Sequence, residues 1–168
     1  MTFRLGKVGL ENLPEVSKVT AQLFHGGDVV VLVGDIGAGK TTFVSELARA
    51  LGSIDEVTSP TFAIVAQYKL KEEINGINEI IHVDTYRLTH VNELFDLGVE
   101  TIFQDYSLTI IEWGERVEDF IDSNYFRIEF DESDVDSRDL TLDFMGEDSE
   151  RKSSISKMLI ENGWVKND

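Results

Sequence analysis

A glycine-rich segment that ends in a lysine and two threonines is the clearest chemical feature of the sequence. Residues 34–41 read Gly-Asp-Ile-Gly-Ala-Gly-Lys-Thr and match the pattern G-x-x-x-x-G-K-[ST]. Glycines permit backbone angles that turn successive N–H groups inward, as a nest for an anion. A helix that starts near Lys40 adds its positive end to that nest. We therefore expect a phosphate-binding loop whose contact residues are Asp35, Ile36, Gly37, Ala38, Gly39, Lys40, Thr41 and Thr42.

Three side chains at the end of this loop have separate expected tasks. Lys40 is a mobile cation that can reach the β and γ phosphates of a nucleoside triphosphate. The hydroxyl of Thr41 is a hard oxygen ligand for Mg²⁺, and Thr42 is placed to bond the α-phosphate. The loop follows a β-branched run and precedes a segment with apolar residues on one helical face, which is the context that phosphate binding requires. ATP and Mg²⁺ are therefore the expected ligands.

Two acidic residues stand where buried strands are predicted to end. Asp84 follows the apolar run 80–83, and Glu112 follows the run 108–111. In open α/β sheets, ligands bind beyond the carboxyl ends of the strands. A phosphate loop needs an acid for Mg²⁺ or its bound water, and a group that orients the attacking water. Spacing alone leaves open which acid holds the metal and which acts on water.

A polar loop with Thr58, Ser59 and Thr61 follows the predicted phosphate-loop helix. Such a loop could sense the γ-phosphate as a switch, or it could simply be a turn before the next strand. His82 alternates with apolar neighbours, so we expect it to pack in the interior rather than to catalyse. The three histidines of the chain are isolated in sequence and predict no histidine-based metal site.

The hydrophobic pattern alternates between helix and strand through the middle of the chain. Helices are predicted at 13–24, 40–51, 91–103 and 116–121, and strands at 29–33, 62–70, 80–84, 107–113, 126–130 and 140–144. Asn75-Gly76 predicts a hairpin turn. This order predicts an α/β, P-loop NTPase-like three-layer fold, with a mostly parallel central sheet and antiparallel edge strands. Residues 1–148 are expected to form a single P-loop ATPase domain, and residues 149–168 a helical C-terminal tail.

The overall composition restricts the partners and the location. The 168 residues carry a net charge of −17, so a broad basic face for direct nucleic-acid binding is disfavoured. The sequence has no cysteine, no signal-peptide pattern and no apolar run of the roughly 20 residues that span a bilayer. A cytoplasmic protein without membrane contact is the expectation.

Several classes of nucleotide-binding protein lack support in the sequence. The Asn-Lys-x-Asp motif of GTPases and the Leu-Ser-Gly-Gly-Gln signature of ABC-type ATPases are both absent. No arginine cluster suggests the lid of a small-molecule kinase. A small ATPase without its own substrate domain remains, and such a protein is expected to work with partners.

Four ordered sequence blocks carry a family resemblance: 34–42, 58–62, 82–88 and 111–114. They read Gly-Asp-Ile-Gly-Ala-Gly-Lys-Thr-Thr, Thr-Ser-Pro-Thr-Phe, His-Val-Asp-Thr-Tyr-Arg-Leu and Ile-Glu-Trp-Gly. Together they closely resemble the bacterial TsaE family of YjeE-like P-loop ATPases, over roughly residues 5–145. That family serves the synthesis of N6-threonylcarbamoyladenosine at position 37 of tRNAs that read codons starting with A.

The resemblance implies roles that the pattern alone does not assign. It implies that Glu112 beside Thr41 is the Mg²⁺ ligand, that Asp84 is the essential acid acting with Lys40, and that Thr58–Phe62 is a switch. It further implies a Mg²⁺-dependent ATPase, weak alone, that acts with TsaB and TsaD and meets tRNA only through them. The alternative is a regulatory ATP-binding module with little hydrolysis.

Overall fold

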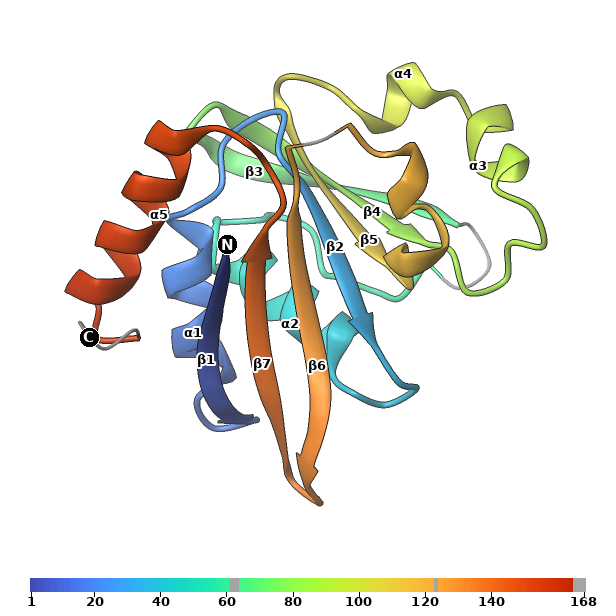
Figure 1. The fold of residues 1–168 in the computed structure, drawn as a ribbon. Coiled ribbons are helices and arrows are strands. Elements are labelled where there is room, and N and C mark those ends of the chain that lie inside the picture. The colour runs from blue at the N-terminus through green and yellow to red at the C-terminus, as the bar shows by residue number, and fades with distance from the viewer. Residues whose placement is uncertain (61–63, 123, 165–168) are drawn as a thin grey trace.

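A seven-stranded sheet with helices on both faces forms the protein (Figure 1). The computed structural model describes residues 1–60, 64–122 and 124–164, apart from the side chains of residues 99 and 100. The strand order is β1-β7-β6-β2-β5-β4-β3. Since neighbouring strands come from distant parts of the chain, this order brings both ends of the sequence to one side of the sheet.

The centre of the sheet is parallel. It consists of β4 (Ile77–Asp84), β5 (Ser107–Glu112), β2 (Val29–Gly34) and β6 (Phe126–Asp134), with parallel pairing between neighbours. The runs in β2, β4 and β5 are rich in valine and isoleucine because helices cover both faces of a parallel sheet. The predicted parallel centre is therefore confirmed.

The edges of the sheet are antiparallel, as predicted. On one side, β3 (Val65–Ile74) pairs with β4 through a turn in which Asn75 and Gly76 have φ of 53° and 78°. Both angles suit the tight hairpin turn predicted for this dipeptide. On the other side, β7 (Ser137–Phe144) pairs with β6, and β1 (Thr2–Gly9) pairs with β7.

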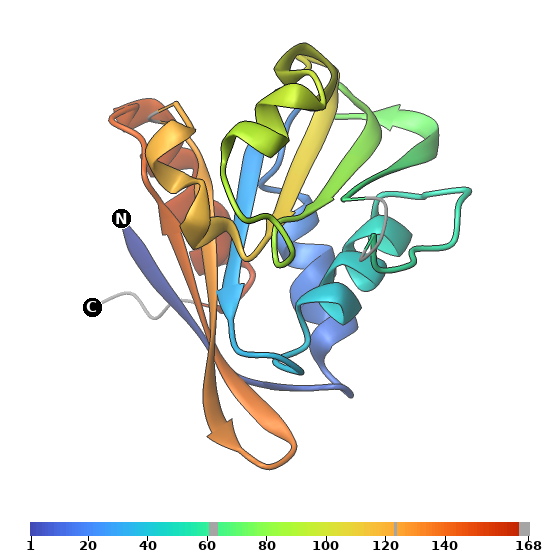
Figure 2. The ribbon, with the colours of Figure 1, turned by 90° about the vertical axis from the view of Figure 1, so that its right-hand side faces the viewer.

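Two helical layers enclose the sheet, and each has its own apolar core. The larger core packs α1 (Leu13–Ala21), α2 (Lys40–Ala50) and α5 (Ser149–Glu161) on one face. The smaller core packs α3 (Asn92–Asp96), α4 (Val99–Ile102) and the 3₁₀ turns η1 (Gly114–Arg116) and η2 (Glu118–Phe120) on the other. These two layers and the sheet between them complete the predicted three-layer α/β fold, and Figure 2 views the sheet from the side of α3.

Several predicted elements have different bounds in the structure. The helix predicted at 91–103 is broken into α3 and α4 at Gly98, whose φ of 90° is left-handed. The helix predicted at 116–121 is instead the pair η1 and η2, because Val117 between them has a non-helical φ of −125°. The strand predicted at 62–70 is β3, which starts at Val65 and runs to Ile74; residues 61–63 lie outside the described residues. The strand β1 was not predicted.

The β6–β7 hairpin extends well past the predicted strands at 126–130 and 140–144. It continues to Asp134 and resumes at Ser137, and it projects beyond the end of β2 (Figures 1 and 2). The outer part of the hairpin carries acidic residues at exposed positions. The alternation of apolar residues therefore ends earlier along the chain than the hydrogen-bonded pairing of β6 with β7.

The C-terminal tail forms the helix α5 over its described part. Ile155 and Leu159 are buried in the larger core. Arg151 donates hydrogen bonds to the carbonyl oxygen of Leu23 and to the carboxylate of Asp28, at 2.8 and 2.5 Å. The helix α5 therefore packs on the same core as α1. Within the described residues, no helix is both long and apolar enough to cross a membrane.

Candidate functional site

The glycine-rich loop joins the carboxyl end of β2 to the first residue of α2. Gly37 and Gly39 have φ of 76° and 102°, in the left-handed region that favours glycine. A Cβ atom on either residue would meet no described heavy atom within 4 Å, so both positions face open space. The loop therefore has the backbone shape and the free volume that an anion nest at a helix N-terminus needs.

The Lys40 side chain folds back over this loop. Its Nζ donates to the carbonyl oxygens of Gly34 and Asp35, at 2.5 and 2.8 Å, and lies 4.1 Å from the centroid of the Trp113 ring. Burial lowers the pKa of the Lys40 ammonium, while the Glu112 carboxylate acts in the opposite direction. The ammonium group is thus held at the loop by dipoles and an aromatic face.

Glu112 and Thr41 meet beside the loop. The hydroxyl of Thr41, in the first turn of α2, donates to Oε1 of Glu112 at 2.8 Å. Glu112 ends β5 and is only 3% exposed. Hydroxyl and carboxylate oxygens are ligands that Mg²⁺ accepts. Among the described residues, no group of three or more His, Cys, Asp and Glu side chains is placed to hold a metal.

Asp84 lies next to Glu112 on the neighbouring strand. The two residues are register partners at the carboxyl ends of β4 and β5. Oδ1 of Asp84 accepts a hydrogen bond from the N–H of Tyr86 at 2.9 Å, which fixes the carboxylate at the start of the turn after β4. The sheet thus brings both predicted acids to the edge where the loop lies.

A cavity of about 340 Å³ lies where these groups converge, and we name it the acid cavity. Its walls are Ile36, Gly37, Ala38, Gly39, Lys40, Thr41, Thr42, Ser59, Asp84, Tyr86, Glu112 and Trp113. Trp113 and Tyr86 form one wall, with ring centroids 4.9 Å apart. Apart from Asp35, every predicted loop contact lines this space.

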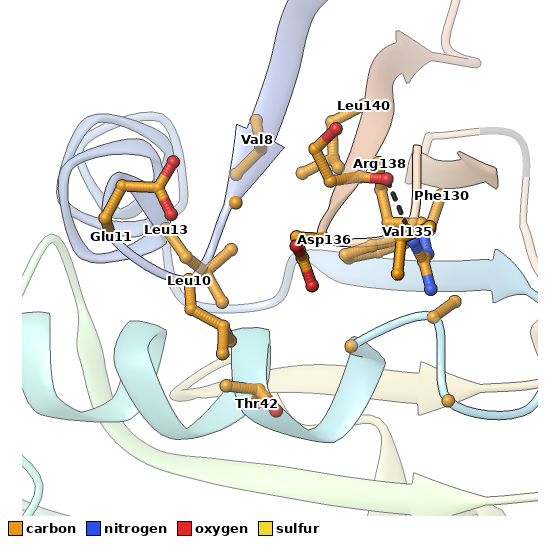
Figure 3. A pocket seen from close by; sticks show the side chains of 15 residues that line it. Val8, Leu10, Glu11, Leu13, Thr42, Phe130, Val135, Asp136, Arg138 and Leu140 are labelled. Atoms are coloured by element: carbon orange, nitrogen blue, oxygen red, sulfur yellow. Dashed lines mark hydrogen bonds between the residues drawn. The ribbon is translucent and has the colours of Figure 1, made fainter. Parts of the chain in front are cut away.

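A second cavity of about 410 Å³ opens on the other side of the loop (Figure 3), and we name it the hairpin cavity. It shares Gly37, Ala38, Gly39 and Thr42 with the acid cavity. Its other walls come from the end of β1, the start of α1 and the β6–β7 hairpin, including Leu10, Val135 and Arg138. This cavity could not be predicted from the sequence pattern, because its walls come from opposite ends of the chain.

His82 has a role that the sequence analysis missed. It is fully buried, as expected, yet both ring nitrogens have polar partners: Nε2 lies 2.8 Å from Oε1 of Glu112, and Nδ1 lies 2.9 Å from the Tyr68 hydroxyl. One signal was available, since residues two apart on a strand share a face, and His82 precedes Asp84 by two. Tyr68 gave no comparable signal, because its place depends on the β3–β4 register.

The predicted switch residues are only partly described. The carbonyl oxygen of Thr58 accepts a hydrogen bond from the Tyr68 hydroxyl at 2.8 Å. Ser59 lines the acid cavity. Thr61 lies outside the described residues. The loop therefore reaches the acid cavity from the side of β3.

Comparisons with known proteins agree on one family. The family model described as "Threonylcarbamoyl adenosine biosynthesis protein TsaE" matches residues 9–140. The tRNA threonylcarbamoyladenosine biosynthesis protein TsaE of Bacillus subtilis is 33% identical over 139 residues, which cover 83% of this chain and 84% of the relative. The protein of the same name from Treponema pallidum is 42% identical over 99 residues, 59% of this chain and 69% of the relative.

A solved structure has a similar fold. The crystal structure of Bacillus subtilis YdiB superposes with a TM-score of 0.67 and 27% identity, covering 97% of this chain and 95% of that one. The family match spans the glycine-rich loop, both acids and most of the β6–β7 hairpin. The chain therefore belongs to the TsaE family of tRNA threonylcarbamoyladenosine biosynthesis proteins.

Proposed function

We propose that this protein binds ATP with Mg²⁺ and hydrolyses it as an accessory step in N6-threonylcarbamoyladenosine synthesis. The observation that carries the proposal is the 2.8 Å contact between Thr41 and Glu112, at the end of a glycine-rich loop in a TsaE-family chain. That pair places a hydroxyl and a carboxylate beside the first turn of a helix, where the phosphates and their metal are expected.

Each group at the acid cavity has a proposed task. The backbone N–H groups from Ile36 to Thr42 and the ammonium of Lys40 bind the phosphates. Thr41 and Glu112 hold Mg²⁺, which neutralises charge on the phosphate oxygens when it is bound. Asp84 orients the attacking water, either directly or through a water on the metal. The hairpin cavity, continuous with the loop at Thr42, receives the nucleoside.

The proposal includes the partners of this family. The chain acts with TsaB and TsaD in the cytoplasm and does not itself transfer the threonylcarbamoyl group. The product is the modified adenosine at position 37 of tRNAs that read codons starting with A. A net charge of −17 supports contact with tRNA only through those partners. The proposal includes weak hydrolysis by the isolated chain, because the assembled partners are expected to complete the site.

A measurement in cells tests the biological role. The protein is depleted in its own organism, and N6-threonylcarbamoyladenosine in bulk tRNA is measured by mass spectrometry. We expect the modified nucleoside to fall, and re-expression of the wild-type chain should restore it. An unchanged level, in cells without a second copy of the gene, contradicts the proposed role.

An assay with purified proteins tests the partner dependence. ATP hydrolysis is measured for the chain alone and with the TsaB–TsaD pair, with Lys40→Ala as the inactive control. We expect little hydrolysis alone and a clear increase with the pair. ATP binding without any such increase would instead support the alternative, a regulatory ATP-binding module.

A further inference from the structure

A chain of hydrogen bonds, buried at His82, leads from the loop at residues 54–60 to Glu112. The hydroxyl of Tyr68 lies 2.8 Å from the Thr58 carbonyl oxygen and 2.9 Å from Nδ1 of His82. On the other side of the ring, Nε2 of His82 lies 2.8 Å from Oε1 of Glu112. The same carboxylate oxygen accepts from the Thr41 hydroxyl. A backbone carbonyl in the loop is thus connected, through two side chains, to the proposed metal ligand.

The direction of these bonds follows from what each group can do. A carbonyl oxygen only accepts, so the single hydroxyl hydrogen of Tyr68 is donated to Thr58. The Tyr68 oxygen then accepts from the Nδ1–H of His82. The contact between Nε2 and Oε1 of Glu112 therefore needs a second hydrogen, carried by the ring or by the carboxyl group. Burial raises the pKa of Tyr68 to about 12, so its hydroxyl keeps the hydrogen at neutral pH.

The middle of the chain is shielded from water, whereas Thr58 at its end is exposed. His82 is fully buried, and Tyr68 and Glu112 are each 3% exposed. A lost contact in such a place is not replaced by bulk solvent, so each member holds its neighbours in place.

A second hydrogen bond joins Asp84 to the backbone of Ile64, which follows residues 61–63 in the chain. The N–H of Asp84 donates to the carbonyl oxygen of Ile64 at 2.8 Å. Ile64 has a φ of 65°, a left-handed angle that β-branched residues rarely adopt. Such an angle persists only where the surroundings fix it. Asp84 is therefore bonded directly to the backbone at Ile64, and Glu112 is connected to the backbone at Thr58 through His82 and Tyr68.

We propose that Tyr68 and His82 are positioning residues that couple the backbone at residues 54–60 to the metal-binding carboxylate of Glu112. The inference rests on the proposed function, because it requires Glu112 to bind Mg²⁺. When Oε1 takes up a metal, its contacts with His82 and Thr41 must adjust, and the ring transmits that change to Tyr68 and Thr58. Coupling of this kind is reciprocal, so the loop conformation also sets the Mg²⁺ affinity.

The test measures metal affinity and loop response together. Binding of the β,γ-imido analogue of ATP is titrated with and without Mg²⁺, and hydrogen exchange is followed over residues 54–60. The variants are Tyr68→Phe, which keeps the ring and removes the hydroxyl, and His82→Gln, whose amide replaces Nε2 but not Nδ1. Tyr125→Phe is the matched control, because Tyr125 is buried in the smaller core, on the opposite face of the sheet.

Tyr68→Phe should raise the half-saturating Mg²⁺ concentration by about tenfold, the typical cost of losing a group that orients a metal ligand. It should also abolish the Mg²⁺-dependent change in exchange over residues 54–60. His82→Gln should lose the loop response but keep part of the Mg²⁺ affinity, because its amide can bond to Glu112 but cannot also reach Tyr68. If Tyr68→Phe fails to fold, His82→Gln alone still tests the loop response. If the two residues were purely structural, the Mg²⁺ affinity and the exchange response of residues 54–60 would not change separately.

Two results would overturn the inference, and they differ. If the wild type binds the analogue with Mg²⁺, and both variants keep its Mg²⁺ dependence and loop response, the coupling is absent while the proposed function stands. If the wild type itself shows no Mg²⁺-dependent binding, the proposed function fails and the coupling fails with it. An equal loss in Tyr125→Phe would also overturn the specific role of Tyr68.

Discussion

The two cavities beside the glycine-rich loop are built from different kinds of contact. The acid cavity is walled by the parallel centre of the sheet, and Glu112 there has hydrogen-bond partners on α2 and β4. The hairpin cavity is walled by antiparallel edge strands, and its walls include exposed apolar side chains such as Leu10 and Val135. The acid cavity is thus tied to the sheet centre by hydrogen bonds, whereas the hairpin cavity is lined in part by exposed apolar side chains. This difference matches the proposed roles of the first in hydrolysis and of the second in nucleoside binding.

The largest expected effect lies at the loop shared by both cavities. Lys40→Ala removes a charged donor to the phosphates, worth about 2–3 kcal/mol, so ATP affinity should fall roughly 100-fold. Inorganic triphosphate, which has no nucleoside, should lose affinity by the same factor. Isothermal titration calorimetry measures both ligands. Lys157→Ala is the matched control, because the Lys157 side chain lies on the exposed face of α5. A loss for ATP alone would place Lys40 with the nucleoside and not with the phosphates.

An intermediate effect should separate the two acids within the acid cavity. Glu112→Gln removes the carboxylate charge next to Thr41, so the tightening of ATP binding by Mg²⁺ should fall about tenfold. Asp84→Asn removes the carboxylate charge at the end of the neighbouring strand. Compared with Glu112→Gln, it should reduce the Mg²⁺-dependent gain in ATP affinity less and slow ATP hydrolysis more. Magnesium titrations and single-turnover hydrolysis measure the two quantities. The reverse order would exchange the two roles.

A smaller effect should be confined to the hairpin cavity. Leu10 is 74% exposed in the protein alone, so a bound nucleoside can cover part of its apolar surface. Leu10→Ser should therefore cost about 1 kcal/mol, roughly a fivefold loss of ATP affinity, and leave inorganic triphosphate unchanged. Leu97→Ser, at an exposed leucine next to α3, is the control and should change neither ligand. Equal losses for both ligands in Leu10→Ser would show that the cavities are not specialised in this way.

The difference between the cavities also explains what the sequence could predict. The parallel strands are short β-branched runs, so their position and their terminal acids follow from local pattern. The glycine-rich loop is likewise a local signal, because its motif and its flanking elements are continuous in sequence. The edge at which Asp84 and Glu112 meet could therefore be predicted, although their exact contacts could not.

The missed features depend on pairings between distant segments. Tyr68 reaches His82 only through the register of the β3–β4 hairpin, which the hydrophobic pattern leaves open. The hairpin cavity forms because β1 pairs with β7, from opposite ends of the chain. The strand β1 is interrupted at Gly6, where its register shifts, and the outer β6–β7 hairpin is acidic on exposed positions. In β1 the apolar alternation covers only Thr2 to Leu5, and in the outer hairpin it is absent, so neither segment carries a full strand signal.

A crystal structure with Mg²⁺ and the β,γ-imido analogue of ATP tests the central claim most directly. We expect the phosphates to contact the backbone from Ile36 to Thr42. We expect the metal to lie beside Thr41 and Glu112, and the nucleoside to lie in the hairpin cavity. A nucleotide bound away from the loop, or a metal held by side chains other than Thr41 and Glu112, would contradict the central claim.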